Sequence, residues 1–172
     1  MQQKAKGPGV IERIQSGILR RRIRKLTGWL GSGNGAIPER LIRKVGADTI
    51  TATALGAYAG GNREKALKAV TVLGDEGIES VRRLCENKSG AERAFAVEML
   101  GLLGSVNDFV VISDLYFDDH NGVVKQRAIL AASTLAARFP ESPEIGSCQK
   151  MVNDARERNG TKVPDALGSR FC

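Results

Sequence analysis

The sequence contains few aromatic residues, one histidine and three cysteines, and each shortage argues against a class of protein. Aromatic residues make up 5% of the 172 positions, which disfavours a β-sandwich, because such cores use aromatic and β-branched side chains. Cys85, Cys148 and Cys172 are far apart and form no CxxC pair. We therefore expect no disulfide framework, and the sequence predicts a cytoplasmic location.

Long apolar runs are also missing. No stretch reaches the roughly 18–20 apolar residues that cross a bilayer, so no transmembrane segment is predicted. A secretory signal is not expected either, because no apolar run precedes a small-residue cleavage site. Hydrophobic residues make up 42% of the chain and charged residues 26%, which is typical of a folded globular protein.

The net charge of +7 is concentrated at the start of the chain. Residues 1–35 contain eight Lys and Arg and one acid, whereas residues 36–172 contain 18 of each sign. Glycines at 31, 33 and 35 favour a hinge, because they allow unusual backbone dihedrals. The sequence therefore predicts three parts: a basic arm with its hinge over 1–35, a helical-repeat body over 36–159, and a tail over 160–172.

Helix signals follow one another along the body, and no segment shows a sustained strand alternation, so an all-α fold is predicted. Asp48, Asn62 and Asn121 are expected N-caps, and Ser89 with Glu92 forms a capping-box pattern. Glycine or proline follows several of the expected helices. These helices cover 38–45, 48–59, 62–73, 78–85, 89–103, 109–115, 121–139 and 142–158.

A pattern recurs over 63–74, 93–104 and 125–136: a basic residue, alanine three positions later, leucine ten positions later, then Gly or Ala. A second apolar helix follows each copy. Leu73 and Leu103 should therefore face a core between repeats. The basic residues Arg63 and Arg93 are expected to bridge to acids or helix ends of a neighbouring repeat.

These three copies resemble HEAT repeats of the short, phycobilisome-lyase-like kind, over 63–138 and more weakly over 37–62 and 139–158. The resemblance implies a short right-handed α-solenoid of antiparallel helix pairs. Ala136 replaces the turn glycine in the third copy, which fits a terminal repeat. The resemblance also implies that partners bind the second helix of each pair, where the candidate contact residues are Glu79, Arg82, Arg83, Glu86 and Asp114.

Residues able to carry chemistry are sparse. His120 lies between Asp118–Asp119 and Asn121–Gly122, which we interpret as a polar turn, because no second histidine or cysteine pair completes a metal site. Cys85 lies on an apolar helix face with no histidine nearby to act as a base. We therefore predict no catalytic set, no metal and no cofactor.

The segment 18–30 is the most distinctive part of the chain, because it is both basic and amphipathic. We considered that it caps the repeats, docks on a partner protein, lies on an anionic membrane, binds nucleic acid or serves as an organelle presequence. Packing against the repeats or a protein is favoured, because the apolar face is regular. The candidate contact residues are Arg20, Arg21, Arg22, Arg24, Lys25, Leu26 and Trp29.

Taken together, the sequence predicts a non-enzymatic scaffold, adaptor or assembly factor that binds a protein partner through a repeat face and the basic helix. The alternative is a nucleic-acid-binding protein that uses the basic arm. A weaker alternative, implied only by the resemblance, is a subunit of a bilin-lyase-like enzyme.

Overall fold

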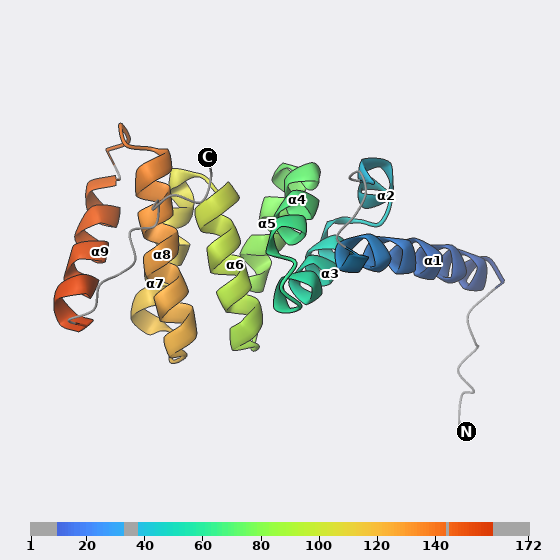
Figure 1. Cartoon of the computed structure of the whole chain (residues 1–172), viewed down its shortest axis with the longest axis horizontal. Helices are drawn as coiled ribbons and strands as arrows, with labels where there is room; N and C mark the ends of the chain where they lie inside the picture. The colour runs from blue at the N-terminus through green and yellow to red at the C-terminus, as the bar shows by residue number, and fades with distance from the viewer. Residues whose placement is uncertain (1–9, 33–37, 144, 160–172) are drawn as a thin grey trace, which may run out of the picture. The chain divides into compact units, whose positions relative to one another are not determined.

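A computed structural model describes residues 10–32, 38–143 and 145–159, and these residues form helices joined by turns, with no strand among them (Figure 1). The all-α prediction is thus confirmed for this part of the chain. The centre of the predicted hinge and the tail 160–172 lie outside it. The helices are α1 (Val10–Ser32), α2 (Glu39–Arg43), α3 (Ala47–Ala59), α4 (Arg63–Leu73), α5 (Asp75–Leu84), α6 (Gly90–Leu103), the 3-10 turn η1 (Val106–Asp108), α7 (Phe109–Asp118), α8 (Gly122–Arg138) and α9 (Ile145–Asn159).

The chain divides into two compact units, Met1–Leu73 and Gly74–Cys172, which we call unit 1 and unit 2. In unit 1, α4 packs against α2 and α3, and α1 packs against α2 and α3. Small and aliphatic side chains fill this unit, as the composition leads one to expect. The largest of those with no more than 1% exposure are Leu26, Leu30, Ile42, Ile50 and Val70.

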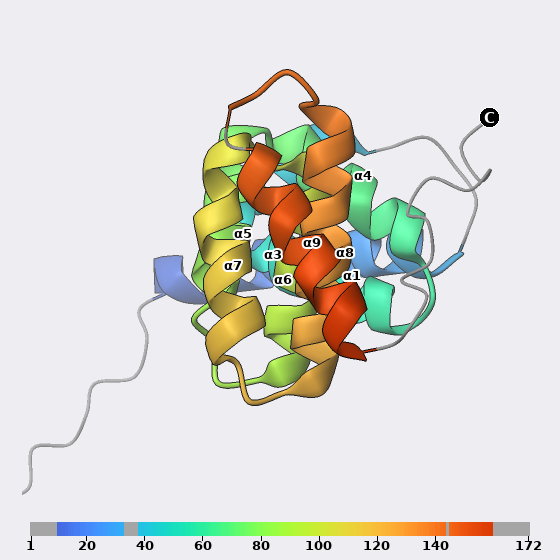
Figure 2. The same ribbon diagram turned by 90° about the vertical axis from the view of Figure 1, so that its left-hand side faces the viewer.

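Unit 2 is built from two successive helix pairs, α5 with α6 and α7 with α8, followed by α9. α8 lies at the centre of the unit, where it packs against α6, α7 and α9 (Figures 1 and 2). α6 is the most buried helix and places Phe95, Met99 and Leu100 in the core with no exposure. The second and third copies of the sequence pattern thus fall on the neighbouring helices α6 and α8.

The first residues of the helices show which predicted N-caps the structure contains. The Ser89 hydroxyl accepts the Glu92 amide and the Asn121 side chain accepts the Val123 amide, so both residues are N-caps as predicted. The predicted capping box at Ser89 is only half formed, because the Ser89 amide donates to Asn87 Oδ1 and not to Glu92. The prediction that Asp48 caps α3 is wrong. The N-cap is Gly46 at φ +93°, a conformation that glycine adopts far more readily than aspartate, and Asp48 lies inside the first turn.

The close approach of α6 to α8 depends on Gly101. A Cβ atom on this residue would lie 2.6 Å from Ala131 Cα, closer than packed atoms come. Arg138 near the end of α8 donates from Nη1 to the Gly101 carbonyl at 2.9 Å. Leu73 and Leu135 are buried as predicted from the pattern, whereas Leu103 is half-buried, so the copies are not equivalent at their leucine.

Candidate interaction surfaces and the ion pairs between helices

Seven exposed cations lie on α1, on α2 and directly after α2 in unit 1. They form no ion pair in the described part of the chain, where α1 from residue 17 onward has no acidic side chain. We call this set the basic surface. Unpaired basic groups gathered on one part of a protein raise the local concentration of anionic partners. The basic surface comprises Arg20, Arg21, Arg24 and Lys25 on α1, Arg40 and Arg43 on α2, and Lys44 directly after α2.

α1 is attached to unit 1 by the apolar side opposite those cations. Leu26 is 0% and Leu30 1% exposed. The carbonyl of Trp29 accepts a hydrogen bond from Lys65, whose ammonium also lies 5.3 Å from the centre of the Trp29 ring. Arg22 donates to the Lys44 carbonyl at 3.3 Å. Of the seven predicted contact residues in the arm, Leu26, Trp29 and Arg22 therefore have packing or bonding roles within unit 1.

The turn of α1 around residues 18–19 differs in exposure from the last turns of the helix. Ile18 is 45% and Leu19 37% exposed. The N-terminal end of α1 extends past α2 and α3 (Figure 1). The apolar side of α1 is therefore buried near residues 26–30 and open near residues 18–19. This contrast shows that α1 is only partly used for packing unit 1.

The two units differ strongly in charge. Residues 1–73 contain 14 Lys and Arg and 4 Asp and Glu, a net charge of +10. Residues 74–172 contain 12 Lys and Arg and 15 Asp and Glu, a net charge of −3. The basic character extends beyond the predicted arm, because α2 and α4 contribute five more cations to unit 1 and Lys44, directly after α2, contributes a sixth. A polyanion would be attracted to unit 1 and weakly repelled by unit 2.

Of the predicted repeat-face residues, Arg82 on α5 is occupied by contacts within unit 2. It donates from Nε to Asp108 Oδ1 at 2.7 Å and from Nη2 to Oδ2 at 3.1 Å. Its Nη1 atom bonds Glu79 at 3.1 Å, and Arg83 lies 3.9 Å from the same carboxylate. Glu86 and Asp114 are exposed. The structure thus pairs Glu79 with both arginines and leaves Glu86 and Asp114 accessible to a partner.

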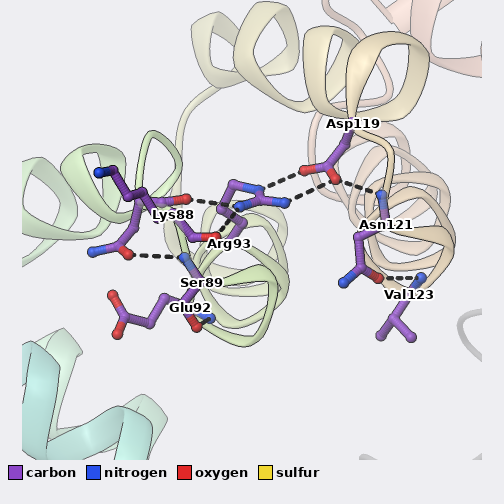
Figure 3. A network of polar contacts seen from close by, with 8 residues as sticks. Lys88, Ser89, Glu92, Arg93, Asp119, Asn121 and Val123 are labelled. Carbon is purple, nitrogen blue, oxygen red and sulfur yellow. Dashed lines mark hydrogen bonds and ion pairs between the residues drawn. The ribbon is translucent and has the colours of Figure 1, made fainter.

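Arg93 and Asp119 form a second, more buried ion pair (Figure 3). Arg93 donates from Nε to Asp119 Oδ2 at 2.6 Å and from Nη2 to Oδ1 at 3.0 Å, and its Nη1 atom bonds the carbonyls of Asn87 and Lys88. Asp119 also accepts the Asn121 amide at 2.7 Å. The prediction that Arg93 bridges to an acid and to the chain beside a helix end is confirmed.

Both aspartates stay ionised to lower pH than usual. Arg93 lowers the pKa of Asp119 by hydrogen bonding, and this outweighs the opposing effect of burial. Burial acts to raise the pKa of Asp108, but hydrogen bonds from Arg82 and from the Ser105 amide more than offset it, so the pKa is lowered. The two carboxylates are therefore structural anions at neutral pH.

Cys85, Cys148 and His120, the residues considered for catalysis, lie in a buried core or in an exposed turn. Cys85 is 6% exposed, and burial raises the pKa of its thiol to about 12; burial also raises the pKa of Cys148 to about 11. Neither thiol is a good nucleophile at neutral pH, because the thiolate is the reactive form. His120 is exposed in the turn before α8. Within the described ranges, no group of three His, Cys, Asp or Glu could hold a metal ion.

A shallow hollow of about 280 Å³ lies between α8 and α9. Its lining contains no charged, histidine or cysteine side chain, and consists of Ser133, Ala136, Gln149, Val152 and Asn153. The hollow therefore offers hydrogen-bonding groups but no acid, base or thiol.

Three large apolar residues of unit 2 are exposed although they lie on or beside well-packed helices. Val110 is 64% and Phe117 53% exposed on α7, and Val123 is 57% exposed at the start of α8. The sequence predicted an apolar helix over 109–115 and placed only Asp114 on its partner-binding side, so the exposure of Val110 and Phe117 was not predicted. The alternation of Val110, Asp114 and Phe117 at helical spacing is the signal that could have identified an outward face.

Asp108 and Asp119 were likewise not recognised as the partners of Arg82 and Arg93. Each aspartate follows its arginine by 26 residues, and each lies directly before a helix or in the turn that leads to one. That repeated spacing was present in the sequence, but a single sequence contains many arginine–aspartate spacings, and only the helix packing distinguishes this one.

No helix in the described ranges is long and apolar enough to cross a membrane. Comparison of the chain with protein-family models, with curated proteins and with solved structures finds no match, so the resemblance to HEAT repeats stays a prediction.

Proposed function

We propose that this protein is a non-enzymatic scaffold or adaptor that binds an acidic partner protein through the basic surface of unit 1. The supporting observation is that the seven exposed cations of the basic surface form no ion pair in the described part of the chain. Keeping so many like charges together disfavours folding, because neighbouring cations on a helix repel. An acidic partner would relieve that repulsion.

Arginine suits this role. Three of the four basic-surface residues on α1 are arginines, whose planar guanidinium groups can bind carboxylates through two parallel hydrogen bonds. Complementary charge mainly speeds association and selects partners, so we expect fast binding that weakens with salt. Unit 2 serves in this proposal as the framework, with Glu86 and Asp114 as accessible acidic groups.

The same proposal includes the helical-repeat architecture. We assign the pairs α6–α7 and α8–α9, each of which begins with a copy of the recurring pattern, to two turns of a short right-handed HEAT-like solenoid. The packing of α6 on α8 and the close approach at Gly101 support it, because stacked repeats bring equivalent helices together. An experimental structure in which the two pairs are not related by a right-handed rotation would contradict this assignment.

The test is affinity capture with three forms of the full chain. The first form is unchanged, and the second replaces Arg20, Arg21 and Arg24 by Gln. The third, a matched control, replaces the exposed unit 2 cations Lys88, Lys150 and Arg158 by Gln, which removes the same charge. We expect acidic partner proteins to be captured by the first and third forms and lost from the second. Equal capture by all three would contradict a role for the basic surface.

Nucleic acid is the second candidate, because a domain with a net charge of +10 and cations along one helix has the electrostatic character of a phosphate-binding surface. If Arg20, Arg21, Arg24 and Lys25 each contact a DNA phosphate, log K should fall against log salt with a slope of about −3.6. Titration of a labelled duplex at several salt concentrations measures this. A slope near zero, or undetectable binding at low salt, excludes this candidate and leaves the protein partner.

A further inference from the structure

α7 carries an outward row of side chains that its own unit does not use. Val110, Asp114 and Phe117 lie at i, i+4 and i+7, on the side of the helix opposite the buried Ile112 and Tyr116. We call these three residues the α7 stripe. Val110 is 64% and Phe117 53% exposed. Single exposed apolar residues are common, but two of them flanking an acid on one face form a surface that suits an amphipathic basic helix.

α1 presents a row with the opposite charge and a similar apolar element. Ile18, Arg21 and Lys25 lie at i, i+3 and i+7, and all three are exposed. We call them the α1 stripe. Ile18, in the N-terminal half of α1, is 45% exposed. The α1 stripe is therefore accessible without unpacking Leu26 or Leu30.

The spacings of the two stripes match when the helices run antiparallel. Ile18 and Arg21 are three residues apart, as are Phe117 and Asp114, a rise of about 4.5 Å in each helix. Ile18 and Lys25 are seven apart, as are Phe117 and Val110. In this register Ile18 meets Phe117, Arg21 meets Asp114, and the aliphatic stem of Lys25 covers Val110.

Each helix also carries an unfavourable charge arrangement that the other would relieve. Arg21 and Lys25 are like charges at i, i+4 on α1, and Asp114 and Asp118 are like charges at i, i+4 on α7. Such pairs destabilise a helix. None of these four residues has an ion-pair partner in the part of the chain that the structure describes. In this register Arg21 lies against Asp114, so one ion pair between the helices offsets part of both repulsions.

We propose that the α1 stripe of one copy of this chain binds the α7 stripe of a second copy, antiparallel and with Arg21 against Asp114. This rests on the proposed function only in taking the partner to be a protein, and it identifies one partner as the chain itself. The contact is heterologous, because two different surfaces meet, so each copy keeps one free stripe of each kind. One helix pair is a small interface, so the association should be weak and depend on concentration.

The first experiment measures the mass of the full chain by sedimentation from about 10 μM to about 1 mM. We expect the average mass to rise steadily above the 18.5 kDa of one chain. Phe117→Ser with Val110→Ser, and separately Ile18→Ser with Arg21→Glu, should each abolish the rise. Val123→Ser and Lys150→Glu are the controls, since they make the same kinds of change on exposed residues outside both the stripes and the basic surface, and they should preserve it.

The second experiment uses the free stripes. A chain blocked at α7 keeps its α1 stripe, and a chain blocked at α1 keeps its α7 stripe. Mixing them should give a species of twice the chain mass that grows no further, because both remaining ends are blocked. In addition, Arg21→Glu and Asp114→Arg should each weaken association alone and restore it when combined in one chain.

Two results would overturn the proposal. A mass equal to one chain at every concentration would show that the stripes do not join copies. Association that survives both blocked variants, or a mixture that stays monomeric, would place the contact elsewhere. Thermal melting measured by circular dichroism should be the same for all variants, since the altered residues are exposed. Either result leaves the capture test of the basic surface intact, because that test neutralises Arg20 and Arg24 as well and detects other proteins.

Discussion

Arg93 on α6 and Asp119 before α8 form a two-bond ion pair, and Arg82 on α5 and Asp108 before α7 form another with the same 26-residue separation. In both pairs the Nε and Nη2 atoms bind the two carboxylate oxygens. Each arginine therefore links its helix to the start of the helix after next. We infer that the two ion pairs fix the packing of the first helix pair of unit 2 on the second.

Replacing Asp119 by Ala should strongly destabilise unit 2. Arg93 would then keep a buried guanidinium without its counterion, and breaking such a pair typically costs about 3–5 kcal/mol. Chemical denaturation followed by circular dichroism measures the loss. Glu64→Ala is the matched control, because the Glu64–Lys68 pair is exposed and should contribute less than about 1 kcal/mol. Equal effects of the two changes would show that burial of Arg93 does not matter.

Stability should fall in acid because of these pairs. The folded-state pKa values of Asp108 and Asp119 lie below the value of about 3.9 in an unfolded chain. Their contribution is therefore fully present above that value and is lost as the pH falls through the lower, folded-state pKa. Denaturation midpoints measured from pH 6 to about pH 2 should drop more for the unchanged protein than for Asp119→Asn. Parallel curves for the two proteins would contradict this linkage.

Gly101→Ala should destabilise unit 2, because the new methyl group would lie 2.6 Å from the Ala131 backbone and force α6 away from α8. Overpacking of this kind costs about 1–3 kcal/mol. The control is Gly28→Ala on α1, where a Cβ meets nothing within 4 Å and the helix should gain up to about 1 kcal/mol. We expect the thermal midpoint to fall for Gly101→Ala and to rise for Gly28→Ala. A rise for Gly101→Ala would show that α6 and α8 lie farther apart than in the structure.

The positions of most helices could be predicted because their signals are local. Ser89 and Asn121 cap α6 and α8 through bonds to amides two or three residues away. The α3 N-cap could not be predicted, because the sequence does not reveal that Gly46 has a positive φ. Asp48, two residues later, has the side chain more typical of an N-cap.

The interaction surfaces were harder to predict, since they depend on which side of a helix its neighbours cover. Sequence alone indicated that Leu26 and Trp29 belong to an amphipathic face, but not that unit 1 itself covers that face. It could not pair Arg82 with Asp108 either. The partner of a charged side chain 26 residues away is decided by helix packing, which the spacing does not specify.

The leucines of the recurring pattern differ in burial, so replacing them should reduce stability by different amounts. Leu73→Asp should unfold much of unit 1, because Leu73 is 6% exposed and an unpaired buried charge costs several kcal/mol, a large part of a domain stability of about 5–15 kcal/mol. Leu103→Asp should be milder, since Leu103 is half-buried and its carboxylate can reach water. Thermal melts of the two variants test the order, and a greater loss for Leu103→Asp would place that residue in the core instead.

The last prediction separates the two sides of α1. Leu26→Ser should destabilise unit 1 by about 2–5 kcal/mol, because it removes a fully buried side chain and places a hydroxyl among apolar neighbours. Arg21→Ala should leave stability within about 0.5 kcal/mol, since the side chain is exposed and has no ion pair in the described part of the chain. Binding should respond in the opposite way: Arg21→Ala should weaken capture of an acidic partner at low salt, and Leu26→Ser should affect it only as far as unit 1 unfolds. Melting and capture measured on the same preparations test both halves, and a Leu26→Ser protein with unchanged melting would show that α1 is not packed on α2 and α3 in solution.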